Sequence, residues 1–278
     1  MKIERYNSPR EFMDDVEDLL LRAPRLNNLM LGLLGHIEER GAGPDDVFLT
    51  VRQGGRRLAG MISGLYLILY ADTAEEAFYN ELVRYLEKQG IDYPGGIGPR
   101  TYCDAFRQAY ESHTGERMEL EMRQRVFKIE SIQRKSPLEG RLVQAKKAHF
   151  PWLRTWMEDF AQAMDEEDLD GEEKLNELIE AKRLFLLEHD ASYVSMAAGI
   201  RPFQSGISIA YVYTPAEYRN QGYATKCVEL LTERLLENYA YCTLYTDLSN
   251  PTSNSIYKKI GYRPVGDSVV YKRPSRGV

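Results

Sequence analysis

The sequence is poor in the residues that build disulfide frameworks and metal sites. Its 278 residues include three cysteines, an odd number at scattered positions, namely Cys103, Cys227 and Cys242. A disulfide framework is therefore not expected, and a reducing cytoplasm is the simplest setting. The four histidines show no metal-ligand spacing with one another or with cysteine, so we predict no metal site. Cys227 could be a nucleophile, but core packing on an expected helix is the favoured role.

Long apolar runs and basic clusters are also missing. The longest apolar run covers residues 60–71, which is too short to span a bilayer as a helix, and residues 1–5 do not form an apolar signal region. Each half of the chain carries three more acidic than basic residues, within a net charge of −6. Because binding to a phosphate backbone needs clustered Lys and Arg, we expect neither a nucleic acid nor a membrane as partner. A cytoplasmic location is the corresponding expectation.

The composition is globular, and the length suits one large domain or two of ordinary size. Residues 136–140, Ser-Pro-Leu-Glu-Gly, are the best candidate linker. We therefore expect two domains, residues 1–136 and residues 137–278. Both halves run from helices to strands and then to a glycine-bearing turn and a helix, without visible sequence repetition. This order suggests a duplicated fold whose first copy has diverged.

Hydrophobic periodicity predicts the individual elements. In the first half we expect helices at 11–21, 24–39, 73–89 and 100–112, strands at 47–52 and 58–70, and an extended start to 119–132. Residues 93–99 cannot be helical, because they are rich in proline and glycine. In the second half the expected helices are 150–164, one ending near 182, 224–238 and 254–260, and the expected strands are 141–145, 184–188, 192–200, 206–213, 242–247 and 265–271.

The pattern most informative about chemistry is a strand, a glycine loop and a helix in direct succession. Residues 207–213 form an apolar strand that stops at Thr214-Pro215, and Arg219-Asn220-Gln221-Gly222 then leads into an amphipathic helix. The first N–H groups of a helix lack internal partners and carry partial positive charge, so this turn can bind an anion. Gly222 lets the main chain approach a phosphate, and Arg219 adds a guanidinium suited to phosphate. A turn that uses glycine only for its geometry is the alternative.

Two segments resemble motifs of the Gcn5-related N-acetyltransferases (GNAT). Residues 211–215 with Arg219-Asn220-Gln221-Gly222-Tyr223-Ala224 resemble motif A, in which an Arg or Gln, two residues, a Gly, one residue and a Gly or Ala follow a strand. Residues 250–262 resemble motif B, an asparagine and a short helix with a tyrosine, then glycine and an aromatic residue. The resemblance covers residues 140–273. It implies an α/β (α+β) fold, with a mixed, mostly antiparallel sheet flanked by helices.

The N-terminal half looks like the first domain of two-domain bacterial predicted acetyltransferases. This softer likeness rests on Gly98-Pro99-Arg100, Phe106, Tyr110, Thr114-Gly115 and residues 122–129. The motif A loop does not occur in this half, so no cofactor role is carried over to it. Two tandem GNAT-like domains, the first divergent, are therefore the expected architecture.

The resemblance implies an N-acetyltransferase that uses acetyl-CoA as cosubstrate and acetylates a primary amine of a small molecule or a peptide. Main-chain groups of two strand residues would pair with the pantetheine, the loop would hold the pyrophosphate, and an N–H near Val212 would stabilise the oxyanion. The implied cofactor-binding residues are Tyr211, Val212, Tyr213, Arg219, Asn220, Gln221, Gly222, Tyr223, Ala224, Thr225 and Asn254. For Asn254, a plain helix cap is the alternative.

The catalytic residues are less sharply indicated. Tyr257 resembles the tyrosine that protonates the departing thiolate in this family, and packing on the sheet is its alternative role. Many relatives carry a Glu on the strand before the loop, but residues 207–213 contain no carboxylate. Asp247, at the end of the next strand, could be the general base through a water, and a proton relayed by solvent is an equal alternative.

Other functions remain open at this point. A non-catalytic CoA-binding sensor or scaffold fits the missing strand carboxylate. Aminoacyl transfer from a charged tRNA by a duplicated fold is a third reading, and the intact loop and acidic balance speak against it. The sequence does not name the acceptor or the oligomeric state, for which a homodimer is one alternative.

Overall fold

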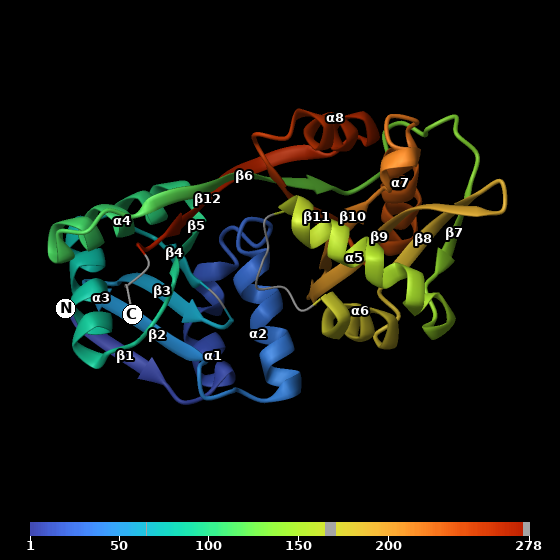
Figure 1. Ribbon diagram of the computed structural model, residues 1–278. Coiled ribbons are helices and arrows are strands. Elements are labelled where there is room, and N and C mark those ends of the chain that lie inside the picture. The colour runs from blue at the N-terminus through green and yellow to red at the C-terminus, as the bar shows by residue number, and fades with distance from the viewer. Residues whose placement is uncertain (65, 165–170, 275–278) are drawn as a thin grey trace. The chain divides into compact units, whose positions relative to one another are not determined.

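The computed structural model describes residues 1–64, 66–164 and 171–274. Its elements follow the order β-α-α-β-β-β-α-β-α-β twice (Figure 1). The first repeat consists of β1 (Lys2–Tyr6), α1 (Pro9–Leu20), α2 (Asn28–Arg40), β2 (Val47–Gln53), β3 (Arg56–Ile62), β4 (Leu67–Ala71), α3 (Glu76–Gln89), β5 (Gly95–Pro99), α4 (Arg100–Thr114) and β6 (Glu119–Ile129).

The second repeat has the same succession, with short 3-10 turns at Lys147–His149 and Ala216–Tyr218. It consists of β7 (Arg141–Gln144), α5 (Phe150–Met164), α6 (Gly171–Glu180), β8 (Leu184–His189), β9 (Ser192–Phe203), β10 (Gly206–Tyr213), α7 (Tyr223–Leu236), β11 (Tyr241–Asp247), α8 (Pro251–Ile260) and β12 (Arg263–Lys272). The repeated order confirms the expected duplication.

The chain divides into two compact units, which we describe separately. Unit 1 comprises Met1–Val126, Tyr245–Asn250 and Pro264–Val278, and unit 2 comprises Phe127–Leu244 and Pro251–Arg263. In unit 2, Ser136 of the expected linker donates its N–H to Glu229 Oε2 of α7 at 2.5 Å, and the buried Glu229 also pairs with Lys226 at 2.9 Å. This contact fixes the start of the expected linker to α7. The boundary between residues 136 and 137 stays a prediction.

The sheet of unit 1 has the order β1-β2-β3-β4-β5-β12. Its neighbours are antiparallel except β4 and β5, which are parallel because α3 crosses between them. Strand β12 pairs with β5 from Ser268↔Pro99 to Lys272↔Gly95, and β6 follows it in the strand order. The last strand of the second repeat therefore belongs to the sheet of unit 1.

The sheet of unit 2 has the order β7-β8-β9-β10-β11. Its neighbours are antiparallel except β10 and β11, between which α7 crosses. Each unit thus has one parallel pair in an otherwise antiparallel sheet. The expected mixed, mostly antiparallel sheet flanked by helices is confirmed.

Successive side chains of a strand point to opposite faces, and strands such as β2, β4 and β8 are buried at consecutive positions, so each sheet has two buried faces. In unit 1, residues such as Leu49 and Leu69 pack with α3 and α4, and Phe48 on the other face meets Phe12 of α1 with ring centroids 5.7 Å apart. In unit 2, α7 and α8 cover one face and α5 and α6 the other (Figure 1). This division matters for the site, because β10 has side chains on both faces.

Some elements differ from expectation. The single strand expected at 58–70 is two strands, β3 and β4, and the chain turns between them at Gly64, whose φ is 77°. Strand β1 was not expected. Strand β5 was expected only to be non-helical, because glycine and proline are poor strand formers. Here glycine is needed: a Cβ on Gly95 would collide with the carbonyl oxygen of Tyr271 in the neighbouring β12.

Among the described residues, no helix has both the length and the apolar character needed to cross a membrane.

Candidate active site

Strand β10 contains a bulge near its C-terminal end. Opposite β9, Ala210 pairs with Ala198 and Tyr213 pairs with Met196, so three steps along β10 face two steps along β9. The extra residue places Tyr211 in the left-handed region, with a φ of 53°. A non-glycine residue held there costs on the order of 1 kcal/mol or more, which the surrounding structure must offset. Bulges of this kind redirect main-chain groups and are common beside active sites.

The parallel pairing on the other edge of β10 is short. It runs from Gly206↔Tyr241 to Ser208↔Thr243, and among the described residues it does not extend to Ile209 or beyond. A ligand with amide groups can therefore pair with the edge of β10 that follows Ser208. The residues predicted to pair with pantetheine, Tyr211 and Tyr213, lie in this segment together with Val212.

The loop after β10 is held by its own side chains. Arg219 Nε donates to the carbonyl of Thr214 at 2.9 Å, and Gln221 Nε2 donates to the carbonyl of Glu217 at 3.0 Å. Asn220 and Gly222 both have positive φ, 63° and 89°. The structure thus gives the loop a tight, left-handed course that leads directly into α7.

Gly222 is the N-cap of α7 and leaves open space above the start of the helix. No atom lies within 4 Å of where its Cβ would be, so glycine is needed for its conformation rather than to avoid a clash. The bond from Lys226 N to Gly222 O, at 3.1 Å, closes the first turn. The N–H groups of Tyr223, Ala224 and Thr225 precede it, where a helix has no internal acceptors. The structure brings these predicted residues together in one turn at the start of α7, and binding of an anion there stays a prediction.

The side chain of Arg219, predicted to contact a phosphate, contacts other residues of the loop and of β10 in this structure. Besides its bond to Thr214, its guanidinium lies over the ring of Tyr213, 5.7 Å from the centroid. The arginine therefore braces the loop against the end of β10. Its contact with a phosphate stays a prediction, and the main-chain amides of the turn are the groups that the structure presents to an anion.

Helix α8 carries the motif B residues. It begins at Pro251, three residues before the expected start, so the half-buried Asn254 lies within the helix and not at its N-cap. The alternative of a plain cap is therefore wrong. Tyr257 is 7% exposed, and its ring centroid lies 6.4 Å from that of Phe127 and 6.0 Å from that of Tyr262. Burial raises the pKa of Tyr257 to about 12, so its hydroxyl is protonated at neutral pH.

Asp247, the predicted general base, is engaged in a turn within unit 1. Its Oδ1 accepts from the N–H of Ser249 at 2.8 Å and its Oδ2 accepts from the Ser249 hydroxyl at 2.5 Å. Both carboxylate oxygens thus stabilise the chain after β11. This bonding competes with the role of base, which stays a prediction.

The sequence reading missed a carboxylate on α5. The hydroxyl of Tyr213 donates to Asp159 Oδ2 at 2.7 Å, and burial together with this bond raises the pKa of Tyr213 to about 12. On the strand side, Ser195 donates its hydroxyl to the carbonyl of Tyr213 at 2.9 Å. The available signal was spacing within the expected helix: Asp159 and Phe160 come three and four residues after Trp156, which places each of them next to Trp156 on the helix surface.

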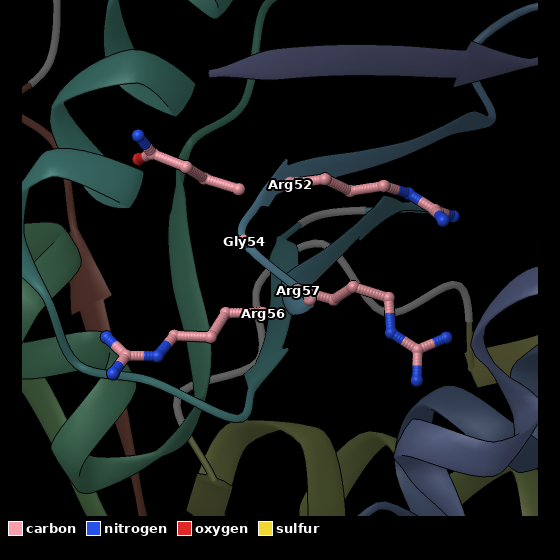
Figure 2. Close-up of a pocket in the computed structure, with 6 residues that line it drawn as sticks. Arg52, Gly54, Arg56 and Arg57 are labelled. Carbon is pink, nitrogen blue, oxygen red and sulfur yellow. The ribbon is translucent and has the colours of Figure 1, made fainter.

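A hollow also lies in unit 1, at the hairpin between β2 and β3. It has a volume of about 450 Å³ and is lined by residues 52–57 (Figure 2). Its three arginines are paired with acids: Arg52 with Asp15, Arg56 with Glu75, and Arg57 with Asp18. Because the charges are matched locally, the hollow is not an anion site comparable with the loop. No cluster of three or more His, Cys, Asp or Glu residues in the described parts of the chain could hold a metal ion.

Comparisons with known proteins find a family similarity in the part of the chain that carries this candidate site. The model of the acetyltransferase (GNAT) family matches residues 149–262, which include the bulge, the loop and α8. No curated protein matches the chain in sequence.

Solved structures with a similar fold cover nearly the whole chain. An acetyltransferase of the GNAT family from Colwellia psychrerythraea is 14% identical, with a TM-score of 0.59 and 98% of this chain and 99% of that chain covered. A Drosophila protein is 12% identical, with a TM-score of 0.67 and 99% of both chains covered. A tandem GNAT protein from the clavulanic acid biosynthesis pathway is 14% identical, with a TM-score of 0.58 and coverage of 100% and 99%. These likenesses establish the fold, including its tandem form.

Proposed function

We propose that the protein is an acetyl-CoA-dependent N-acetyltransferase acting on a primary amine. Residues 149–262 match the model of the acetyltransferase (GNAT) family, whose general activity is acyl transfer. The observation that carries the proposal is the combination of a bulged β10 with the glycine-capped turn that begins α7. The bulge offers main-chain groups at a strand edge, and the turn offers amides to an anion. A thioester joined to a pyrophosphate through an amide-containing arm needs both.

The residues present fit acetyl-CoA. Open space above Gly222 gives a pyrophosphate access to the amides of residues 223–225. The part of β10 after Ser208, beyond its parallel pairing with β11, suits the pantetheine amides. Asn254, half-buried in α8, is the proposed side-chain contact from motif B.

The cosubstrate supplies an activated acetyl group: the carbonyl carbon exchanges its bond to sulfur for one to the amine nitrogen, which loses a proton while the thiolate gains one. The N–H of Val212, beside the left-handed Tyr211, is the proposed donor to the carbonyl oxygen as negative charge develops there. Tyr257 is the proposed donor to the sulfur. Its raised pKa keeps the hydroxyl protonated, so it acts first by donating a hydrogen bond to the thiolate.

One observation favours a second candidate, a CoA-binding module without catalysis. Strand β10 carries no carboxylate, and both oxygens of Asp247 are bonded to Ser249. Among the residues predicted for the site, neither β10 nor Asp247 therefore offers an available carboxylate that could act as the base. We keep catalysis as the proposal, because an amine can lose its proton to solvent.

The test compares binding with turnover for the full chain. Calorimetry with CoA measures binding, and release of free thiol from acetyl-CoA in the presence of a panel of primary amines measures transfer. We expect binding together with amine-dependent thiol release, and an acetylated product by mass spectrometry. Binding without amine-dependent release would favour the second candidate. Absence of CoA binding would refute both.

A further inference from the structure

The two faces of β10 differ in how tightly helices close them. On one face Val212 packs against a cluster in which Cys227, Val228 and Leu231 of α7 are fully buried. On the other face the ring of Tyr213 meets Trp156 and the ring of Tyr211 meets Phe160, both on α5. An acceptor amine must come within about 3–3.5 Å of the thioester carbon. The α7 face has no room for it, so the α5 face of the bulge is the approach that remains.

That face is built from aromatic rings. Trp156 lies 5.9 Å from Tyr213 and Phe160 lies 5.5 Å from Tyr211, measured between ring centroids. Trp156, Phe160 and Tyr211 are only half-buried, so parts of these rings remain accessible beside the bulge. Accessible rings next to one another bind flat apolar groups by offset or edge contacts and attract cations to their faces.

One carboxylate borders these rings. Asp159 is exposed on α5 and accepts the hydroxyl proton of Tyr213 at 2.7 Å. Within the described residues, no Lys, Arg or His nitrogen lies within ion-pair distance of it. Arg219 lies over the Tyr213 ring, with its Nε bonded to Thr214, and offsets part of the negative charge. A carboxylate so placed complements a cationic ligand.

We propose that the α5 face of β10, formed by Trp156, Asp159, Phe160, Tyr211 and Tyr213, is the acceptor-binding site, and that it takes a small amine carried on an aromatic body. The rings hold the aromatic body, and Asp159 pairs with the ammonium group as it arrives. The inference rests on the proposed function and names the substrate class of that same site.

The first test is a substrate comparison with wild-type protein. Phenethylamine, butylamine and phenylalanine share an amine but differ in the aromatic ring and in an added carboxylate. We expect kcat/KM for phenethylamine to exceed that for butylamine by about tenfold, because ring contacts of this kind are worth about that factor. Phenylalanine should be poorer than phenethylamine, since its carboxylate would meet Asp159. Equal or better turnover of butylamine would overturn the inference.

The second test separates Asp159 from its neighbour. Asp159→Asn can still accept the Tyr213 hydrogen bond but removes the charge, so KM for phenethylamine should rise about tenfold. The kcat, and the KM for acetyl-CoA, should stay within about twofold. Glu158→Gln is the matched control: Glu158 is exposed on the same helix and faces Arg154 at 3.5 Å. It should leave all three constants unchanged.

The outcomes keep this inference distinct from the proposed function. If acetyl-CoA binds and amines are acetylated, but Asp159→Asn behaves like Glu158→Gln, only the acceptor site is refuted. If a sugar amine or a peptide is preferred over phenethylamine by tenfold or more, the substrate class is wrong. If no amine is acetylated, the proposed function fails first.

Discussion

In both repeats a helix joins a parallel pair of strands, but the chain enters that helix in two different ways. In the second repeat the entry is Arg219-Asn220-Gln221-Gly222, with a left-handed glycine as N-cap of α7. In the first repeat residues 72–75, Asp-Thr-Ala-Glu, precede α3, and Glu76 adds a further acid in its first turn. One helix start offers amides to an anion, while the other already has carboxylates beside it.

The first loop is also closed by bonds of its own. The N–H of Glu75 donates to the hydroxyl of Thr73 at 3.2 Å, and Tyr79 donates its hydroxyl to the carbonyl of Thr73 at 2.9 Å. Asp72 Oδ1 accepts from the N–H of Arg57 at 3.0 Å. The strand before it is regular, since β4 pairs with β3 from Leu67 to Ala71 without a bulge.

The space beside the parallel pair of unit 1 is small. In unit 1 a cavity of about 10 Å³ remains at the C-terminal ends of β4 and β5, lined among others by Met30, Tyr70 and Tyr245. That volume holds about one water molecule. The comparison teaches that the repeated fold supplies only the framework. The bulge of β10 and the glycine cap of α7 are the local features that distinguish the second repeat, and the proposed cofactor site rests on them.

The largest expected effect concerns the glycine cap. Gly222→Asp would put a side chain and a negative charge at the anion position, so CoA affinity measured by calorimetry should fall by at least about a hundredfold. Ala74→Asp, a matched change in the exposed loop before α3, should leave CoA affinity unchanged. Gly222→Ala isolates the strain of the positive φ and should bind more tightly than Gly222→Asp. Equal affinity of Gly222→Asp and wild type would remove the loop from the site.

The next effect concerns how unit 1 holds the end of the chain. Arg273 is 8% exposed, its Nη1 donates to the carbonyl of Tyr93 at 3.0 Å, and its guanidinium lies 4.4 Å from the Tyr93 ring centroid. Arg273→Ala should lower the free energy of unfolding by about 2–3 kcal/mol, because the buried carbonyl of Tyr93 loses this donor and the cation–π contact is lost. Lys272→Ala, at an exposed neighbour, should change it by less than about 0.5 kcal/mol in the same urea titration. Similar values for the two variants would show that Arg273 does not anchor β12.

Tyr257 is expected to matter for rate and not for binding. Tyr257→Phe keeps the ring, so CoA affinity should stay close to wild type, while kcat should fall at least about tenfold. Since burial raises the Tyr257 pKa above its ordinary value, the hydroxyl is protonated below both values, and kcat should show no falling limb from Tyr257 below about pH 10.

The control for this prediction is a second buried tyrosine. Tyr262 exchanges a hydrogen bond of 2.8 Å with Thr232 within the same core. Tyr262→Phe should reduce stability by about 1 kcal/mol and leave kcat within about twofold. If Tyr257→Phe stays within threefold of wild type, Tyr257 only packs and is not part of the mechanism.

The comparison of repeats also shows what a sequence can predict. The helix α5 could be predicted because its apolar residues recur with helical periodicity. The loop before α7 could be predicted because its positive φ favours glycine. The bulge could not be predicted. Tyrosine does not favour the left-handed conformation that Tyr211 adopts, and tertiary contacts impose this conformation. The bond between Asp159 and Tyr213 joins residues 54 positions apart, and no local pattern predicts such a pair. Strand β5 was missed because glycine is a poor strand former, and here Gly95 is needed because the backbone of β12 lies too close for a Cβ.

The smallest expected effect concerns the prediction that the first repeat binds no cofactor, for which charge at the start of α3 and packing beside β4 and β5 are two possible reasons. The double variant Glu75→Gln with Glu76→Gln removes both acids at the start of α3. We expect no additional CoA to bind in calorimetry, because the space beside β4 and β5 holds only about one water. Stability should fall by less than about 1 kcal/mol, since Glu76 loses a favourable interaction with the helix dipole and Glu75 an exposed pair with Arg56.

The matched control removes an acid from the opposite kind of helix end. Glu39 is exposed in the last turn of α2, where the dipole disfavours negative charge, so Glu39→Gln should leave stability unchanged or raise it slightly. A second equivalent of CoA bound by the double variant would show that the two carboxylates alone exclude the cofactor. In that case the packing beside β4 and β5 would not be what excludes CoA, and the first repeat would be a cofactor site disabled by charge. An unchanged stoichiometry with slightly lower stability would mean that packing beside β4 and β5 excludes CoA and that Glu75 and Glu76 stabilise α3.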